Sequence, residues 1–169
     1  MTGDRGTIDR LLGHNAWATA LLADRCRALS PQQFARRFEI GPGTLQRTLL
    51  HIVGAMRRWA DRIGDRAVRP SVEDEVSAPT PDEIIAILDE TAADLAAVVG
   101  CVVDEDRLDE IMEHRIRGWD EPFRFTRGTA IIHVLTHGVH HRAQALNILR
   151  RLGVEDLPDL DAIEWELHS

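Results

Sequence analysis

Two histidines near the C-terminus have the spacing of metal ligands. His137 and His141 are four residues apart, so an α-helix places both imidazoles on one face, about 40° apart around the axis. Neutral imidazole nitrogens on neighbouring turns can bind one divalent transition metal ion. Gly138 follows His137, so the segment lacks the built-in glutamate of the HExxH motif. The alternative is a pair of partly buried histidines that form hydrogen bonds within the core.

A binding or catalytic site needs at least a third ligand, and His51 is the best candidate elsewhere in the chain. It flanks the apolar stripe of a helix predicted over residues 45–63, which places it at the rim of an interface between helices. A side chain at that rim can project into a cleft. Without further ligands, a single histidine in this position is more often structural or exposed.

The other histidines carry weaker signals. His133 and His140 share the broad face of His137, so they either adjoin the site or are polar side chains at the edge of the helices. His14, in the first predicted helix, is a further residue that can point to the same cleft. Two histidines are predicted to lie on the surface, His114 and His168.

No motif for a nucleophilic enzyme accompanies the histidines. The chain has no GxSxG segment and no phosphate-binding glycine loop. The tryptophans are predicted to pack in the core or at a dimer contact, and the alternative for each is the lining of a substrate pocket. They are Trp17, Trp59, Trp119 and Trp165.

Length, charge and cysteine usage narrow the class of protein. A chain of 169 residues can bury one core, so we expect a single domain over residues 1–169. The net charge of −8 disfavours nucleic-acid binding. We expect no membrane span and no signal peptide, because long apolar runs are absent. Cys26 and Cys101 form no CxxC pattern, which favours a reducing, cytoplasmic location.

Hydrophobic periodicity predicts four long helices that could position these histidines. They cover residues 7–29, 45–63, 81–100 and 127–152. Threonines stand at the expected N-cap positions of the last three: Thr44, Thr80 and Thr126. Glycines follow the same three helices as stop signals: Gly64, Gly100 and Gly153. The pattern indicates an all-α protein, with a four-helix bundle as the leading architecture.

Shorter segments connect the predicted helices. Ser30-Pro31 begins a short helical turn over 31–36. Residues 65–81 are polar, contain three prolines and are predicted to form a long connection across one end of the bundle. Residues 113–125 alternate in the manner of a short hairpin before the last long helix. The tail has a potential helical turn around 161–166.

Three segments, in this order, resemble the DinB/YfiT-like family of bacterial proteins over nearly the whole chain. Residues 14–18, His-Asn-Ala-Trp-Ala, are similar to the family's aromatic-Asn-x-Trp-Ala segment. Residues 50–55, with Trp59 further on, resemble its second-helix ligand segment. Residues 133–144 resemble its histidine-rich last helix, which usually ends in His-His-Arg-Gly-Gln. The chain departs from the family pattern at His14 for tyrosine, Thr19 for asparagine and Ala143 for glycine.

The resemblance implies an up-down-down-up bundle, with residues 65–81 as one crossover, and a homodimer. It also implies that His51, His137 and His141 bind the metal, which is zinc, nickel, iron or manganese. Three nitrogen ligands leave positions open for water or substrate. The general affinity order favours nickel or zinc over manganese.

Relatives of this kind include S-transferases that use low-molecular-weight thiols such as bacillithiol or mycothiol. An open three-histidine metal site lowers the pKa of a thiol and presents the thiolate to an electrophilic small molecule. Arg142, the arginine nearest in sequence, is expected either to pair with a carboxylate of the thiol or to form a structural ion pair. Two other functions remain open. One is metal-dependent hydrolysis, for which no carboxylate base is identified, and the other is a non-enzymatic stress-response role as a metal-binding protein.

Overall fold

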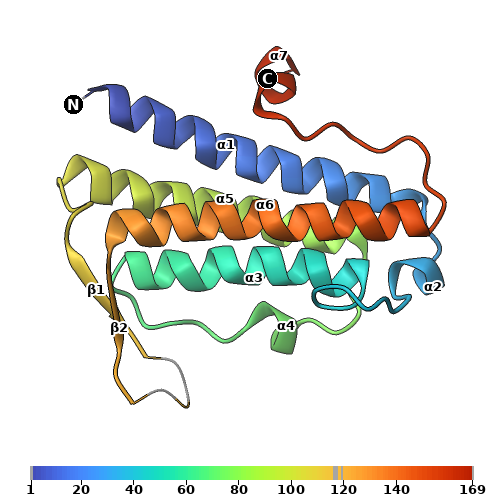
Figure 1. Ribbon diagram of the computed structural model, residues 1–169, viewed down its shortest axis with the longest axis horizontal. Helices are drawn as coiled ribbons and strands as arrows, with labels where there is room; N and C mark the ends of the chain where they lie inside the picture. Colours follow the sequence, from blue (N-terminus) through green and yellow to red (C-terminus); the bar gives the residue numbers. More distant parts are fainter. Residues whose placement is uncertain (1, 116–117, 119, 169) are drawn as a thin grey trace.

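Four long helices lie side by side in the computed structural model (Figure 1), which describes residues 2–115, 118 and 120–168. They are α1 (Thr2–Arg25), α3 (Leu45–Ile63), α5 (Pro81–Asp104) and α6 (Arg127–Arg151). Following the colours of Figure 1, α1 and α6 run in one direction and α3 and α5 in the other. The short elements are η1 (Cys26–Ala28), α2 (Pro31–Phe34), α4 (Val72–Glu75), β1 (Ile111–His114), β2 (Phe123–Thr126) and α7 (Ala162–His168). The protein is therefore mostly helical, with one two-stranded sheet.

The inward stripes of the long helices form the core. α3 packs against α5 and α6, and α1 packs against the same two helices. Each fully buried Leu or Ile contributes about 1.5–3 kcal/mol of hydrophobic free energy, so these stripes stabilise the helices more than local propensity does. The largest fully buried side chains include Leu22, Leu45, Leu49, Ile52, Met56, Ile84, Leu88, Leu95, Ile148 and Leu149.

The predicted starts of the last three long helices are confirmed, whereas the first long helix begins at Thr2 rather than residue 7 and ends at Arg25 rather than residue 29. The hydroxyl groups of the three N-cap threonines accept hydrogen bonds from backbone N–H groups of the first turns, and Ser30 forms a capping box with Gln33 at the start of α2. The predicted stop at Gly100 is wrong, since α5 continues to Asp104. The apolar stripe continues past this glycine, because Val99 and Val102 are both buried.

The connection between α3 and α5 is more ordered than the sequence indicates. It contains α4, whose Val72 is buried in the core. Asp61, buried on α3, accepts hydrogen bonds from the backbone and the side chain of Arg69, both at 3.0 Å. Burial alone would raise the pKa of Asp61, but Arg69 and Arg66 outweigh it and lower the pKa. These contacts hold the connection along the side of α3.

The hairpin predicted over 113–125 is confirmed, with β1 beginning two residues earlier. Its strands are antiparallel, and His114 pairs with Phe123. The buried Arg127, at the start of α6, fixes the base of the hairpin. Its guanidinium donates to Glu110 at 2.6 Å and to Asp65 at 2.5 Å, and also to the carbonyl group of Ile63 at the end of α3.

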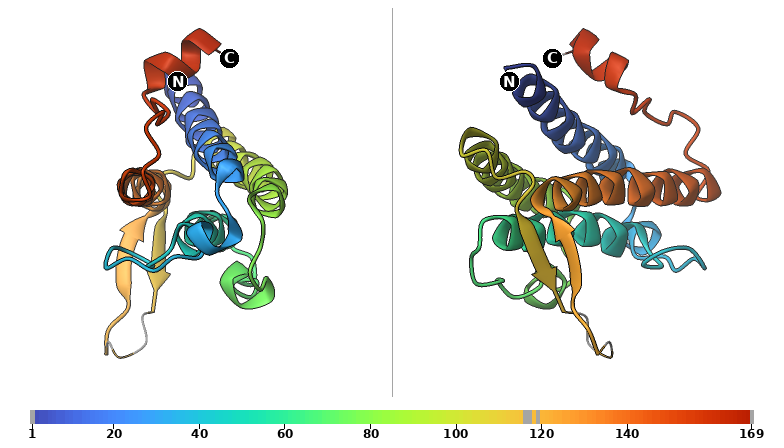
Figure 2. Two further views of the ribbon diagram at one scale, coloured as in Figure 1. Left: turned by 90° about the vertical axis from the view of Figure 1, so that its right-hand side faces the viewer. Right: turned by 60° about the vertical axis from the view of Figure 1, so that its left-hand side comes forward.

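The C-terminal tail turns back over α1. Figure 2 shows α7 against α1, on the side of the molecule away from α3. The turn predicted around 161–166 is confirmed as α7, whose Trp165 packs on Gly13. Within the described residues, no helix combines the length and the apolar character that crossing a membrane requires.

Candidate metal centre

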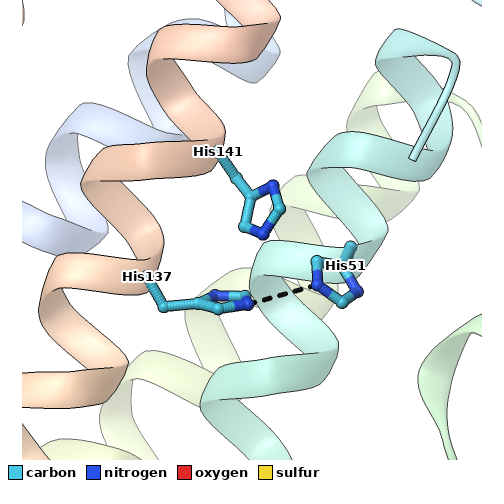
Figure 3. Close-up of side chains that lie close together, drawn as sticks. All are labelled: His51, His137 and His141. Atoms are coloured by element: carbon cyan, nitrogen blue, oxygen red, sulfur yellow. Dashed lines mark hydrogen bonds between the residues drawn. The ribbon is translucent and has the colours of Figure 1, made fainter. Parts of the chain in front are cut away.

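The antiparallel neighbours α3 and α6 bring three predicted ligands together (Figure 3). His51 faces His137 and His141, and each ring offers a nitrogen within 4.8 Å of the others. The Nε2 atoms of His51 and His137 are 3.2 Å apart. Two imidazoles bound to one tetrahedral zinc ion at ~2.0–2.1 Å would have their nitrogens about 3.3–3.4 Å apart. The spacing therefore suits a single ion.

Hydrogen bonds on the far sides of two rings orient their lone pairs toward this centre. The Nδ1 atom of His51 lies 3.1 Å from Glu73 Oε1, and that of His141 lies 2.8 Å from Gln144 Oε1. Both oxygens are acceptors, so each Nδ1 carries a ring proton, and the Nε2 atom of the neutral ring presents a lone pair. A carboxylate or amide behind a ligating histidine fixes its tautomer and increases its basicity. In its neutral form each ring thus has the tautomer that metal binding needs.

The surroundings of His137 disfavour the charged form of its ring. Burial, with the neighbouring His141, His51 and His133 rings, lowers the pKa of His137 to about 3. Burial likewise lowers the pKa of His141. Both are therefore neutral at pH 7. The Nδ1 atom of His137 is buried and has no hydrogen-bond partner within the described residues, so its proton can reside on Nε2 and be donated to His51.

Glu73 is the functional residue that sequence reasoning missed. It lies on α4 and also forms a salt bridge with Arg58 at 3.0 Å and accepts a hydrogen bond from Ser71. Burial alone would raise the pKa of Glu73, but the hydrogen bonds from His51 and Ser71 and the charge of Arg58 hold it well below its ordinary value. The carboxylate approaches α3 closely because residue 54 is glycine: a Cβ atom there would clash with it.

Two of the other histidines adjoin the centre. The exposed ring of His133 lies 5.8 Å from that of His137, one turn away on α6. His140, also exposed, accepts a hydrogen bond at 2.9 Å from the Nε2 atom of Gln144, the side chain that orients His141. His133 therefore borders the centre, and His140 supports it through Gln144.

The structure decides the direction of His14, which the sequence left open. Its Nε2 atom lies 2.7 Å from the carbonyl oxygen of Leu160 in the tail, and its ring lies 6.1 Å from Trp17 and 6.3 Å from Trp165. His14 thus faces the C-terminal tail. The apolar pattern of the first helix did not determine on which side of that helix His14 lies.

Arg142 belongs to the packing of α6 on α1. It is only 3% exposed and donates to Asn15 Oδ1 at 2.6 Å and Thr19 Oγ1 at 3.2 Å. Burial lowers its pKa to about 10. Both acceptors are neutral. The prediction of a structural ion pair is therefore wrong: Arg142 forms none with the residues that the structure describes. The expected pairing with a thiol carboxylate is not supported either, because the guanidinium is turned toward α1.

The surface prediction holds for His168, which is exposed, and fails for His114. His114 is half-buried with its ring 5.8 Å from Trp59.

The tryptophans differ in their surroundings. Trp59 lines a pocket, which was the alternative to packing in the core or at a dimer contact. Trp17 and Trp165 are half-buried at the contact of the tail with α1, and Trp119 lies outside the described residues.

One cavity includes His51 in its lining, and a second lies beside His133. One, of ≈ 310 Å³, is polar and is lined by Pro42, Arg47, His51, Arg58, Ser71 and Glu73. The other, of ≈ 330 Å³, is mostly apolar and is lined by Trp59, His114, Phe123, Phe125, Thr129, Ala130 and His133. The arrangement thus combines three imidazole nitrogen donors with a polar and an apolar cavity.

The comparisons with known proteins identify one family. The model of the DinB family matches residues 3–165, nearly the whole chain. A comparison with curated proteins finds no match.

Proposed function

The chain belongs to the DinB family, and from its three-histidine centre we propose that it is a metal-dependent S-transferase. Its substrates are a low-molecular-weight thiol and an electrophilic small molecule. The observation that carries the proposal is the 3.2 Å separation of the His51 and His137 Nε2 atoms, with His141 beside them. A bound divalent ion in such a site supplies the positive charge that lowers the pKa of a thiol.

His51, His137 and His141 are the proposed ligands, and Glu73 and Gln144 orient two of them. Imidazole ligands suit zinc, nickel and iron, and manganese binds more weakly to such a set. Three ligands from the protein leave coordination positions for a substrate. The polar and apolar cavities supply space on two sides of the centre.

Arg47, rather than Arg142, is the proposed partner for a carboxylate of the thiol. It lines the polar cavity with His51, its side chain is exposed, and it forms no salt bridge with the residues that the structure describes. Arg58, by contrast, is engaged by Glu73. A guanidinium binds a carboxylate through two parallel hydrogen bonds.

Further parts of the proposal concern the whole protein. We take residues 1–169 as one four-helix-bundle domain, which the packing of α3 and α1 on α5 and α6 supports. A homodimer is supported by large exposed apolar side chains on α1 and α6: Leu11 (46%), Ile132 (63%) and Val139 (56%). Two free cysteines support a cytoplasmic location, and the net charge of −8 supports the absence of a nucleic-acid partner.

The first test is the metal content of the untagged protein by mass spectrometry. We expect about one ion per chain after incubation with zinc or nickel, loss of that ion in His137→Ala, and its retention in the surface control His168→Ala. A wild-type protein that stays metal-free would overturn the three-histidine site.

The second test is turnover. The proposal predicts consumption of monochlorobimane that depends on added bacillithiol or mycothiol and is abolished in His51→Ala. Turnover of a substrate without thiol would indicate a hydrolase instead. Metal-dependent stability without any turnover would indicate a non-enzymatic metal-binding protein.

A further inference from the structure

The apolar cavity beside His133 has walls made largely of rings. Trp59 comes from α3, Phe125 and His114 come from the hairpin, and His133 comes from α6. The ring centroid of Trp59 lies 4.9 Å from that of His133, 5.8 Å from that of His114 and 6.0 Å from that of Phe125. These tilted rings surround a space of ≈ 330 Å³. Ligand pockets range from roughly 300 to 1,000 Å³, so this space suits one or two fused rings.

The hairpin builds one wall of the cavity by strand geometry. Phe123 and Phe125 are two residues apart, so they lie on the same face of β2, and they pair across the sheet with His114 and Met112. Met112 is buried against the core, which directs this face toward α3 and α6. The contacts of Arg127 with Glu110, Asp65 and Ile63 hold the base of the hairpin in place.

The lining favours an uncharged ligand. Among the residues that the structure describes, its side chains are rings, a methyl group and the hydroxyl group of Thr129, with no carboxylate or guanidinium. Arg62 lies over the Trp59 ring at 5.4 Å and would repel a cation. Burial, with Arg62 and His133, lowers the pKa of His114, so this ring is neutral at pH 7. An anion would lose its hydration without a charged partner among the described lining residues, because the Arg62 guanidinium lies over the Trp59 ring and is not part of the lining.

The cavity also adjoins the metal centre. His133 lies one turn before His137 on α6, about 6 Å along the axis, and the two ring centroids are 5.8 Å apart. On α3, Trp59 lies two turns after His51, and Arg47 of the polar cavity lies one turn before it. The centre therefore has an apolar cavity toward one end of α3 and a cationic side chain toward the other.

We propose that this cavity binds a flat, uncharged aromatic group of the electrophilic substrate, so that the enzyme prefers aryl or arylalkyl electrophiles. That the bound group belongs to a substrate rests on the proposed function. The binding itself depends only on Trp59, Phe123, Phe125, His114 and His133. Aromatic rings pack edge-to-face or offset at centroid distances of roughly 4.5–7 Å, which the walls can provide around a bound ring.

The test measures binding without thiol and without turnover. Isothermal titration calorimetry of the full-length, zinc-incubated protein uses 2-naphthol as an unreactive, uncharged probe and 2-naphthalenesulfonate as its anionic counterpart. We expect 2-naphthol to bind more tightly than the sulfonate. We also expect Phe123→Ser and Trp59→Leu each to weaken the binding of 2-naphthol by about tenfold or more, the loss of one aromatic contact and its buried area.

Matched controls separate the cavity from other features. Trp17→Leu, which changes a half-buried tryptophan outside the cavity, should leave 2-naphthol binding unchanged. So should removal of the metal with a chelator, because the lining contains none of the three ligands. Phe123 lies on the hairpin and is 38% exposed, so Phe123→Ser tests the cavity even if Trp59→Leu is unstable.

The outcomes distinguish this inference from the proposed function. No binding of 2-naphthol to the wild type, or equal affinity in all variants, would overturn the aromatic cavity even if thiol transfer were observed. Tight binding that the cavity variants lose, without any thiol transfer, would support the cavity and overturn the transferase.

Discussion

The Nδ1 atom of His51 lies 3.1 Å from a carboxylate oxygen of Glu73, so the connection between α3 and α5 contacts a candidate metal ligand. The same carboxylate binds Arg58 and Ser71. These three contacts leave Glu73 poorly placed to act as a base toward a bound water. Its role is to hold the His51 ring in one tautomer and one orientation.

Replacement of Glu73 by glutamine should weaken metal binding without removing any ligand. The variant keeps a hydrogen-bond acceptor but loses the negative charge behind His51, and changes of this kind reduce metal affinity by about 10–100-fold. The measurement is a zinc titration in competition with a chromogenic chelator.

Glu75→Gln is the matched control for this substitution, because Glu75 lies on the same short helix and pairs with Arg57 instead. It should retain wild-type zinc affinity. Equal losses in the two variants would show that the charge of α4 as a whole matters, rather than the contact of Glu73 with His51.

The ligand candidates could be predicted because each lies on a long helix. The four-residue spacing of His137 and His141 and the position of His51 beside its stripe depend only on helical geometry. Glu73 has no comparable signal. It lies in a polar, acidic segment whose conformation is set by tertiary contacts: the burial of Val72 and the pairing of Asp61 with Arg69.

The direction in which an individual polar side chain points could not be predicted from the sequence either. Arg142 follows His141 directly, yet one residue rotates a side chain by about 100° around the helix, which turns the guanidinium toward α1. The aromatic cavity required the three-dimensional position of the hairpin. Its rings come from α3, the hairpin and α6, and Trp59 on α3 lies far in the sequence from His114 and His133, so no local pattern brings them together.

The stability of the metal-free protein should fall as the solution becomes acidic. An imidazole in the unfolded chain has a pKa near 6.5, whereas that of His137 in the folded protein is about 3. Between these values the unfolded chain binds more protons, so the free energy of unfolding decreases as the pH falls below about 6.5. His141, whose pKa is also lowered, contributes in the same direction.

Urea unfolding in the presence of a chelator, at about pH 7 and about pH 5, measures this dependence. We expect His137→Gln to lose less stability between the two conditions than the wild type, because one titrating group is gone. The exposed His168→Gln should behave like the wild type. Identical losses in wild type and His137→Gln would contradict the lowered pKa of His137.

Asn15→Ala should destabilise the protein while leaving metal binding intact. Asn15 supplies the closest acceptor of the buried Arg142 guanidinium, at 2.6 Å. Its loss leaves a buried charge short of a partner, which costs about 2–3 kcal/mol of unfolding free energy. Urea denaturation gives the stability, and a zinc titration gives the affinity.

Asn147→Ala is the control for Asn15→Ala. Asn147 lies on α6, and its Oδ1 atom has no hydrogen-bond partner within the described residues, so its removal should cost much less. A loss of zinc affinity in Asn15→Ala would instead place Arg142 in the support of the metal centre.

Gly54→Ala should separate helix stability from metal affinity. Alanine favours a helix interior over glycine by about 1 kcal/mol. Its Cβ atom, however, would clash with the carboxylate of Glu73 and lie 3.0 Å from Nη1 of Arg58. The Glu73 side chain must then withdraw from His51, so zinc affinity should fall although the metal-free protein is no less stable.

Gly6→Ala on α1 is a matched helical control, since its Cβ atom would meet only Arg10 at an ordinary 3.5 Å. The zinc affinity of this variant should be unchanged.

A double variant, Gly54→Ala with Glu73→Gln, tests whether the loss of zinc affinity in Gly54→Ala passes through Glu73. If Gly54→Ala acts through Glu73, the double variant should bind zinc little worse than Glu73→Gln alone, because the two changes remove the same contact. Fully additive losses would show that alanine at position 54 disturbs His51 directly.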